Sequence, residues 1–201
     1  MCSLLEIVLV CHGQGEHSLQ PPASLEVVHP ALTALGRTQA AALRERLQPT
    51  PRDAIVAGPT LRALQTAAIA TEGTGAVVFV SPYLGPRTFP FPEDDAEVCA
   101  ITSLSDYILS AKSVKKQFPA FRVLHDHYRG ITNEGVGRMD RERFRGSVER
   151  LVAWAVGLRR ARLLAFSHGG TIAHYRELLA GTPPRPALPE DGTYIAFAVD
   201  R

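Results

Sequence analysis

The sequence predicts an α/β fold, a three-layer αβα sandwich in which a mostly parallel sheet lies between two layers of helices. Two observations support this fold class. Short apolar, β-branched runs alternate along the chain with longer stretches of helical periodicity, which is typical of a parallel sheet covered on both faces. The chain has 201 residues, of which 45% are hydrophobic and 21% are charged. It can therefore bury one sizeable core and is neither disordered nor fibrous.

Five short runs of apolar and β-branched residues are expected to form buried strands, because a helix needs more length. These runs are residues 4–10, 53–57, 76–80, 163–166 and 194–199. The first run ends at His12 and Gly13, and the fourth is followed by Ser167 and His168. Polar residues and glycines at such points mark the end of a strand.

Four stretches between these strands are expected to be helices. They cover residues 33–47, 59–71, about 140–160 and about 170–179. Thr33 can cap the first helix, and Pro59 suits the start of the second. Phe144, Val148 and Leu151 recur on one face of the third, as the apolar side of a surface helix requires.

Residues 81–139 show no clear pattern. Pro82, Pro86, Pro90 and Pro92 interrupt any regular element there. We expect a long insertion or lid region at about 81–139, lying over the sheet of a single domain that spans residues 1–201. Long loops of this kind in compact domains are often functional.

Features of the whole chain argue against several other classes of protein. The 22 basic and 20 acidic residues leave a net charge of +2, which is too weak to indicate a nucleic acid or a membrane surface as partner. No apolar run approaches the roughly 18–20 residues that span a bilayer, and residues 1–10 do not resemble a signal peptide. The three cysteines are widely spaced, which argues against disulfides and a zinc cluster. We therefore expect a cytoplasmic protein, and its oligomeric state stays open.

Polar groups follow three of the predicted strands at their carboxyl ends, where parallel sheets bind ligands. His12, Arg62 and His168 occupy these places, so we expect them to form one cationic pocket. A phosphoryl group fits such a pocket, because arginine presents a planar pair of donors to phosphate oxygens. Neutral imidazole can also attack phosphorus. The predicted partner is a small phosphorylated molecule or phosphate.

Four blocks of the sequence have distinctive patterns: VCHGQGEHS at 10–18, HPALTALGRTQA at 29–40, GPTLRALQTA at 58–67 and SHGG at 167–170. They resemble, in this order, motifs of the histidine phosphatase (phosphoglycerate mutase-like) superfamily. The first block is similar to the Arg-His-Gly motif, in the form found in the fungal and plant phosphoglycerate-mutase-like branch. Together the blocks are highly specific, and the resemblance implies a phosphoglycerate mutase-like fold.

The resemblance also implies a role for each matched residue. His12 would attack phosphorus and become a phosphohistidine, while Arg62 and His168 would bind the equatorial oxygens and stabilise their charge. Four further positions are expected to bind phosphate: Gly13, Gln14, Ser18 and Gly169. No metal and no organic cofactor are expected, because the histidine chemistry needs none.

Members of this superfamily also need a carboxylic acid to protonate the leaving oxygen. Glu97 is the candidate, at about the usual distance before a segment, 106–121, that resembles a Cys-Asp…Phe-Pro stretch of that branch. Glu93 is the alternative. The position that a Leu-x-Glu pattern would give after Leu84 is occupied by Pro86.

The sequence departs from the motifs at three positions, of which Cys11 matters most. Cys11 stands where the superfamily has arginine, Ser18 where it has asparagine, and His29 where it has aspartate. A thiol supplies neither the fixed charge nor the paired donors of arginine, and a missing arginine at a phosphoryl site costs roughly 10³–10⁵ in rate. The sequence thus predicts a phosphomonoesterase with reduced activity. The alternative is an inactive pseudophosphatase that binds a phosphorylated ligand or another protein.

Overall fold

The computed structural model of the protein describes residues 4–87, 103–181 and 190–200. These residues form a six-stranded sheet of order β4-β3-β2-β5-β1-β6. The strands are β1 (Leu4–Cys11), β2 (Ala54–Ala57), β3 (Val78–Val80), β4 (Arg122–Val123), β5 (Arg162–Ser167) and β6 (Tyr194–Asp200). All neighbouring pairs are parallel except β1 and β6. The predicted α/β fold with a mostly parallel sheet is confirmed.

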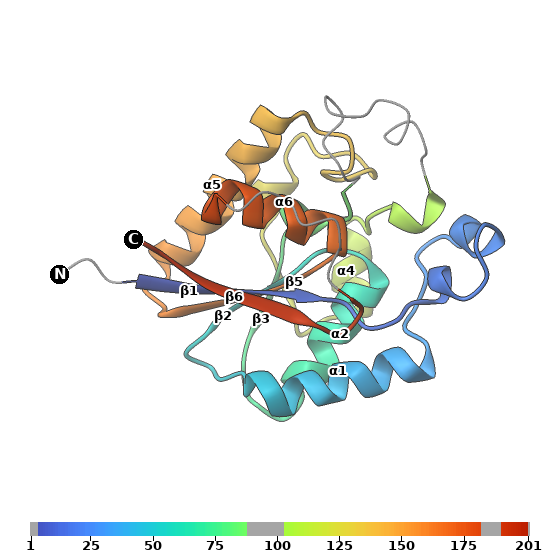
Figure 1. The fold of residues 1–201 in the computed structure, drawn as a ribbon, viewed down its shortest axis with the longest axis horizontal. Helices are drawn as coiled ribbons and strands as arrows, with labels where there is room; N and C mark the ends of the chain where they lie inside the picture. The colour runs from blue at the N-terminus through green and yellow to red at the C-terminus, as the bar shows by residue number, and fades with distance from the viewer. Residues whose placement is uncertain (1–3, 88–102, 182–189, 201) are drawn as a thin grey trace.

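Helices cover both faces of this sheet (Figure 1). In the described residues they are α1 (Ala34–Leu47), α2 (Leu61–Thr71), α4 (Ala111–Gln117), α5 (Arg141–Gly157) and α6 (Gly169–Ala180). Helices α5 and α6 lie on one face, and α1 lies on the other (Figure 1). Thr33 caps α1 as predicted, since its hydroxyl accepts a hydrogen bond from the Gly36 N–H at 3.0 Å.

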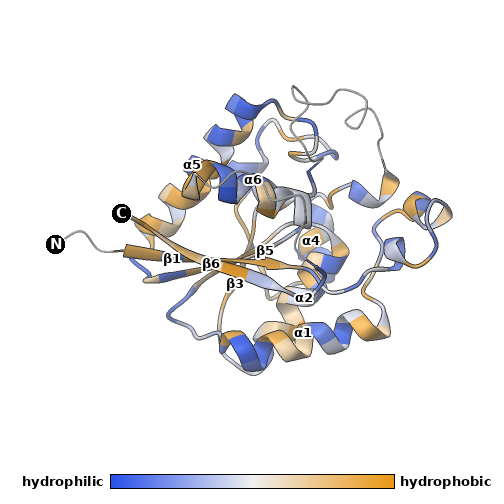
Figure 2. Ribbon diagram, in the orientation of Figure 1, coloured by the Kyte–Doolittle hydropathy of each residue, from blue (hydrophilic) through white to orange (hydrophobic). Residues whose placement is uncertain are grey.

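The core consists of two apolar layers, one on each side of the sheet. Side chains alternate along β1, so Ile7 and Leu9 pack in the layer of α5 and α6. Val8 and Val10 pack in the layer of α1 and α2. Both faces of β1 are therefore buried, which is why its sequence is almost continuously apolar (Figure 2).

The segment 81–139 contains more regular structure than its prolines indicated. Helix α4 forms because the Ser110 hydroxyl accepts from the Ser113 N–H at 3.2 Å and Val114 is fully buried. Strand β4 is only two residues long, too short for an apolar pattern to reveal it. Residues 88–102 lie outside the described residues, so the lid stays a prediction.

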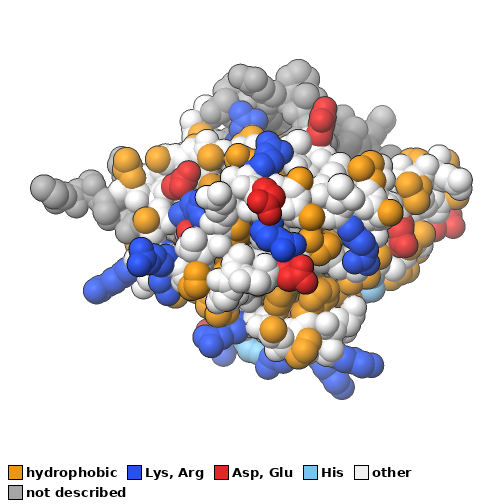
Figure 3. All heavy atoms as spheres, turned by 90° about the horizontal axis from the view of Figure 1, so that it is seen from below, with side chains coloured by type: hydrophobic (Ala, Val, Ile, Leu, Met, Phe, Trp, Pro, Cys, Tyr) orange, Lys and Arg blue, Asp and Glu red, His pale blue; other side chains and the backbone are white. Residues whose placement is uncertain are grey.

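The surface of the described residues shows no extended patch of one charge on the face below the sheet. Basic and acidic side chains are interspersed there with apolar ones (Figure 3), as the net charge of +2 leads one to expect. Among the described residues, no helix combines the length and the apolar character that crossing a bilayer requires.

Candidate active site

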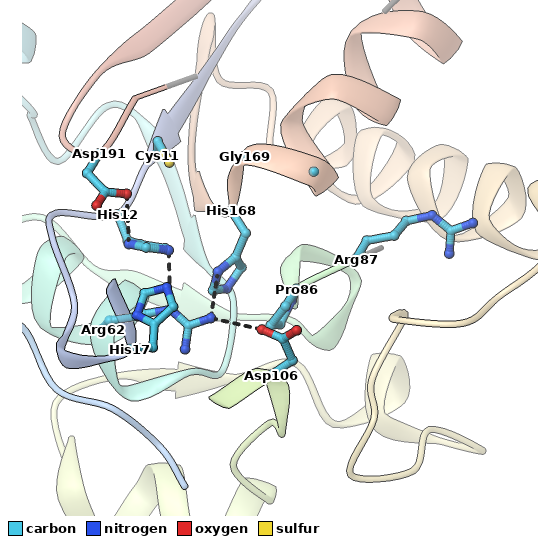
Figure 4. Close-up of a pocket in the computed structure, with 11 residues that line it drawn as sticks. Cys11, His12, His17, Arg62, Pro86, Arg87, Asp106, His168, Gly169 and Asp191 are labelled. Carbon is cyan, nitrogen blue, oxygen red and sulfur yellow. Dashed lines mark hydrogen bonds and ion pairs between the residues drawn. The ribbon is translucent and has the colours of Figure 1, made fainter. Parts of the chain in front are cut away.

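His12, Arg62 and His168 meet at the carboxyl edge of the sheet. His12 follows β1, Arg62 lies in the first turn of α2, and His168 stands between β5 and α6. Strands β2, β5 and β1 are consecutive in the sheet, so these three strand ends are adjacent. The imidazole centroids of His12 and His168 are 4.8 Å apart. The structure thus brings together the three residues that sequence reasoning placed in one pocket (Figure 4).

His12 is held as a neutral imidazole in a defined orientation. Its Nδ1 lies 2.8 Å from the carbonyl oxygen of Gly13, and only an Nδ1–H can donate to that oxygen. Its Nε2 then accepts a hydrogen bond from Arg62 Nε at 3.2 Å. Burial, followed by the charge of Arg62, holds the pKa of His12 well below 6.5. The lone pair on Nε2 is therefore present at neutral pH.

Arg62 is a buried cation, with 1% of its surface exposed. It donates to His12 Nε2, to the Ser105 carbonyl oxygen at 2.8 Å and to Asp106 Oδ1 at 3.3 Å. Its Nη2 also lies 3.3 Å from His168 Nδ1. Desolvation of such a charge is costly unless every donor finds a partner. The protein acceptors around Arg62 take four of its five N–H donors, which offsets much of that cost.

His168 completes the arrangement with the opposite tautomer. Its Nδ1 faces the Arg62 guanidinium and accepts from it, so its Nε2 carries the proton and donates to Thr60 Oγ1 at 3.2 Å. Thr60 also caps α2, because its hydroxyl accepts from the Ala63 N–H at 3.4 Å. Burial and then the charge of Arg62 hold the pKa of His168 well below 6.5.

These three side chains line a cavity of about 250 Å³ together with Cys11, the departure from the first motif, and with residues that the sequence did not assign to the site. The further lining residues with reactive or charged groups are Cys11, His17, Arg87, Asp106 and Asp191. Burial, followed by the charge of Arg62, lowers the pKa of His17 to about 4. Asp106 begins the segment that resembles a Cys-Asp…Phe-Pro stretch, but that resemblance gave it no role in the site, and no motif marks Asp191. His17, which lies within the first motif block, could have been found from its place near His12.

Both acidic residues of the cavity have raised pKa values. Burial raises the pKa of the Asp106 carboxyl, although the Arg62 charge acts in the opposite direction. The same balance of burial against the Arg62 charge raises the pKa of Asp191. The predicted acids Glu97 and Glu93 both lie outside the described residues. Among the described residues, Asp106 and Asp191 are the carboxyl groups that line the cavity.

Of the four residues expected to bind phosphate, only Gly169 lines the cavity. The Gly13 N–H donates instead to Thr66 Oγ1 at 3.1 Å. The Gln14 side chain accepts from the Thr33 hydroxyl at 2.8 Å, and Ser18 is exposed.

Gly13 has a packing role that the motif alone does not reveal. A Cβ at Gly13 would lie 2.4 Å from the carbonyl oxygen of Gly36, and a Cβ at Gly36 would lie 2.1 Å from that of Gln14. Both positions must therefore be glycine for the turn after β1 to pack against the start of α1.

Cys11, which stands where the motif has arginine, lies in the cavity wall. Cys11 is 1% exposed, and burial together with the nearby Asp191 charge raises the pKa of its thiol to about 12. Pro86, which stands where a Leu-x-Glu pattern would place an acid, also lines the cavity (Figure 4). Arg87 also lines the cavity, but its guanidinium donates to the carbonyl oxygens of Val136 and Met139, so in the described residues Arg62 is the arginine that contacts His12.

Comparison with known proteins supports the resemblance seen in the motifs. Residues 7–89 match the sequence model of the histidine phosphatase superfamily (branch 1). No protein with a curated description matches the chain.

Solved structures of phosphatases share the fold over nearly the whole chain. A mycobacterial glucosyl-3-phosphoglycerate phosphatase with VO3 is 22% identical, with a TM-score of 0.59 over 96% of this chain and 92% of that one. The ecdysone phosphate phosphatase from Bombix mori in complex with tungstate is 13% identical, with a TM-score of 0.67 over 96% of this chain and 88% of that one. A protein described as mycobacterial hydrolase 1 is 21% identical, with a TM-score of 0.61, and the match covers 97% of this chain and 92% of that one.

Proposed function

We propose that the chain hydrolyses a small phosphomonoester slowly, through a phosphohistidine on His12. The proposal rests on its similarity in sequence and fold to the histidine phosphatase superfamily and to solved phosphatases. One observation carries this proposal. The Nδ1 of His12 lies 2.8 Å from the Gly13 carbonyl oxygen, which fixes the ring with its unprotonated Nε2 toward Arg62 and the cavity. A nucleophile with that tautomer needs no base to activate it.

The substrate phosphate enters the cavity and takes over donors of the Arg62 guanidinium. This exchange frees His12 Nε2, which now accepts a hydrogen bond from Arg62 Nε. The Nε2–P bond then forms as the bond between phosphorus and the leaving oxygen breaks, and Arg62 and His168 stabilise the charge on the equatorial oxygens. Water attacks the phosphohistidine in the second step and gives its proton to the carboxylate that protonated the leaving oxygen, which returns the lone pair to Nε2, restores the acid and releases phosphate.

The leaving oxygen takes up a proton from a carboxyl group. Glu97 is our proposal from the sequence, and Asp106 is the described carboxyl that best fits the need. It lines the cavity and contacts Arg62 at 3.3 Å, with 52% of its side chain exposed. Its partial burial raises its pKa, which favours the protonated form that a general acid requires.

The slow rate follows from what surrounds His12. Cys11 supplies no second guanidinium to the phosphate, and Pro86 supplies no carboxyl. Arg62 must also exchange a protein partner for the substrate, because its donors contact His12, Ser105 and Asp106. These same observations favour one other function, a pseudophosphatase that binds a phosphorylated ligand without cleaving it.

An assay with a generic aryl phosphate separates the two functions. We expect slow release of the phenol by the wild type and none by His12→Asn, together with a phosphorylated protein trapped by alkaline denaturation in the wild type alone. His125→Asn is the matched control, because His125 is exposed and outside the cavity. If the wild type binds inorganic phosphate in calorimetry but releases no phenol, the chain is a pseudophosphatase. Equal activity in His12→Asn rules out the phosphohistidine.

A further inference from the structure

Cys11, His12 and Asp191 form a cluster of metal-ligand side chains at the end of β1. One ligand atom from each residue lies within 4.8 Å of the other two, and the Nδ1 of His12 is 3.8 Å from Asp191 Oδ1. The three side chains lie together in the cavity wall (Figure 4). Sequence reasoning did not group them, because Asp191 is 179 residues after His12 (191 − 12).

The backbone fixes this cluster independently of its side chains. The Gly192 N–H donates to the His12 carbonyl oxygen at 2.8 Å, and the Cys11 N–H donates to the Thr193 carbonyl oxygen at 2.9 Å. A Cβ at Gly192 would lie 2.7 Å from that of Gln39, so this turn also packs closely against α1. Asp191 is therefore held over the end of β1 by main-chain contacts, and a ligand set held in this way loses little conformational freedom on binding.

A thiolate, an imidazole and a carboxylate together suit a borderline-soft divalent cation. Zinc bonds of about 2.3 Å to sulfur, about 2.0–2.1 Å to nitrogen and about 2.0–2.2 Å to oxygen bring tetrahedral ligand atoms to roughly 3.3–3.7 Å from one another. The Nδ1–Oδ1 distance of 3.8 Å is already close to that range. Three protein ligands with an open fourth position are typical of accessible zinc sites, and here the cavity provides the fourth position.

We propose that Cys11 Sγ, His12 Nδ1 and an Asp191 carboxylate oxygen bind Zn²⁺, with the fourth coordination position facing the cavity. On binding, the Cys11 thiol releases its proton to solvent and the sulfur forms a bond to the metal. The proton on His12 Nδ1 is replaced by the metal, and the neutral ring carries its proton on Nε2 instead. The two anionic ligands balance the 2+ charge of the ion beside the buried Arg62.

The metal and the nucleophile exclude each other at His12. A metal on Nδ1 breaks the hydrogen bond to the Gly13 carbonyl oxygen. A proton on Nε2 removes the lone pair that now accepts from Arg62 and that would attack phosphorus. Zinc is thus an inhibitor of the hydrolysis. This consequence rests on the proposed function, whereas binding of the ion does not.

The test uses Co²⁺ as a spectroscopic stand-in for zinc. The chain carries three cysteines, so a Cys2→Ser, Cys99→Ser background leaves Cys11 as its only thiol. We expect one equivalent of Co²⁺ to give a thiolate-to-cobalt charge-transfer band, and Zn²⁺ to abolish it by displacement. Cys11→Ser should lose the band, and Asp191→Asn should bind Co²⁺ at least about tenfold more weakly. Glu190→Gln is the matched control, because Glu190 is an exposed acid next to Asp191 that does not line the cavity.

Two results overturn the assignment. One is a folded background protein that gives no thiolate band with equimolar Co²⁺. The other is a Glu190→Gln variant that weakens binding as much as Asp191→Asn does. Because Asp191 is partly exposed, with a side-chain exposure of 32%, its variant stays informative even if Cys11→Ser does not fold. If the aryl phosphate is not hydrolysed at all, the Co²⁺ titration still shows whether the metal binds.

If it is hydrolysed, Zn²⁺ should inhibit hydrolysis by the protein that keeps Cys11 as its only thiol but not hydrolysis by Cys11→Ser. Equal inhibition of both proteins refutes the metal site.

Discussion

Replacing Cys11 with arginine tests whether the missing guanidinium is the main defect of the proposed phosphatase. Cys11 is 1% exposed and lines the cavity next to His12. A guanidinium about 4 Å from a transferring phosphoryl group contributes about 4 kcal/mol at an effective dielectric constant of about 20. If this interaction stabilises only the transition state, it lowers the activation free energy by that amount, which increases the rate roughly 10³-fold.

Two features of the structure reduce this gain. Asp191 lies close enough to Cys11 for its charge to raise the pKa of the thiol, so it would pair with the new guanidinium in the resting enzyme. Burial would also disfavour a second cation beside Arg62. We therefore expect Cys11→Arg to increase kcat/KM for an aryl phosphate by about 10²-fold, and the added change Asp191→Asn to increase it about tenfold more.

Two further variants at the same position separate charge from size. Cys11→Lys supplies a cation without paired donors and should give a smaller increase than arginine. Cys11→Gln supplies length without charge and should give none. Circular dichroism and urea unfolding check that each variant is folded. A folded Cys11→Arg variant that binds inorganic phosphate more tightly but hydrolyses no faster refutes the reasoning, because the guanidinium would then not act on the transition state.

The remaining predictions concern stability. Phe144 is fully buried, with the Arg87 guanidinium 4.3 Å from its ring centre and Tyr175 edge-on to it. Phe144→Ala should therefore lower the free energy of unfolding in urea by about 3–5 kcal/mol, whereas the exposed control Arg145→Ala should change it by less than about 0.5 kcal/mol. His12 and His168 have pKa values held well below 6.5 by burial, so below that pH the unfolded chain binds protons that the folded chain does not. The free energy of unfolding should thus fall as pH drops from about 6.5 to 5, by up to about 1.4 kcal/mol per pH unit for each histidine. A slope that His12→Asn leaves unchanged would contradict this origin.

Local sequence was sufficient to predict the main elements and three residues of the site. Strand β1 is apolar on both faces because both are buried, and that pattern is visible without a structure. His12, Arg62 and His168 could be placed together because each follows a parallel strand, and the carboxyl ends of such strands share one edge of the sheet.

The rest of the cavity depends on contacts between distant segments. Asp106 reaches Arg62 because the Leu109 N–H donates to the Pro59 carbonyl oxygen at 2.7 Å, which ties its loop to the start of α2. Asp191 reaches His12 through the hydrogen bond that the Gly192 N–H makes. No periodicity or motif encodes either pairing. The sequence also could not reveal the packing role of Gly13, because this role depends on the carbonyl oxygen of Gly36, which is distant along the chain.

A single substitution connects the slow phosphatase with the metal site. An arginine in place of Cys11 would stand between His12 and Asp191 as a permanent cation and would pair with that carboxylate. The thiol leaves the carboxylate without this partner, and burial keeps the pKa of Asp191 raised despite the charge of Arg62. In the proposed phosphatase, cysteine at this position supplies no activating charge and places a soft ligand beside an imidazole and a carboxylate. If both proposals hold, the proposed hydrolytic activity of this site falls as the concentration of the metal ion rises, because the ion occupies the nucleophilic imidazole.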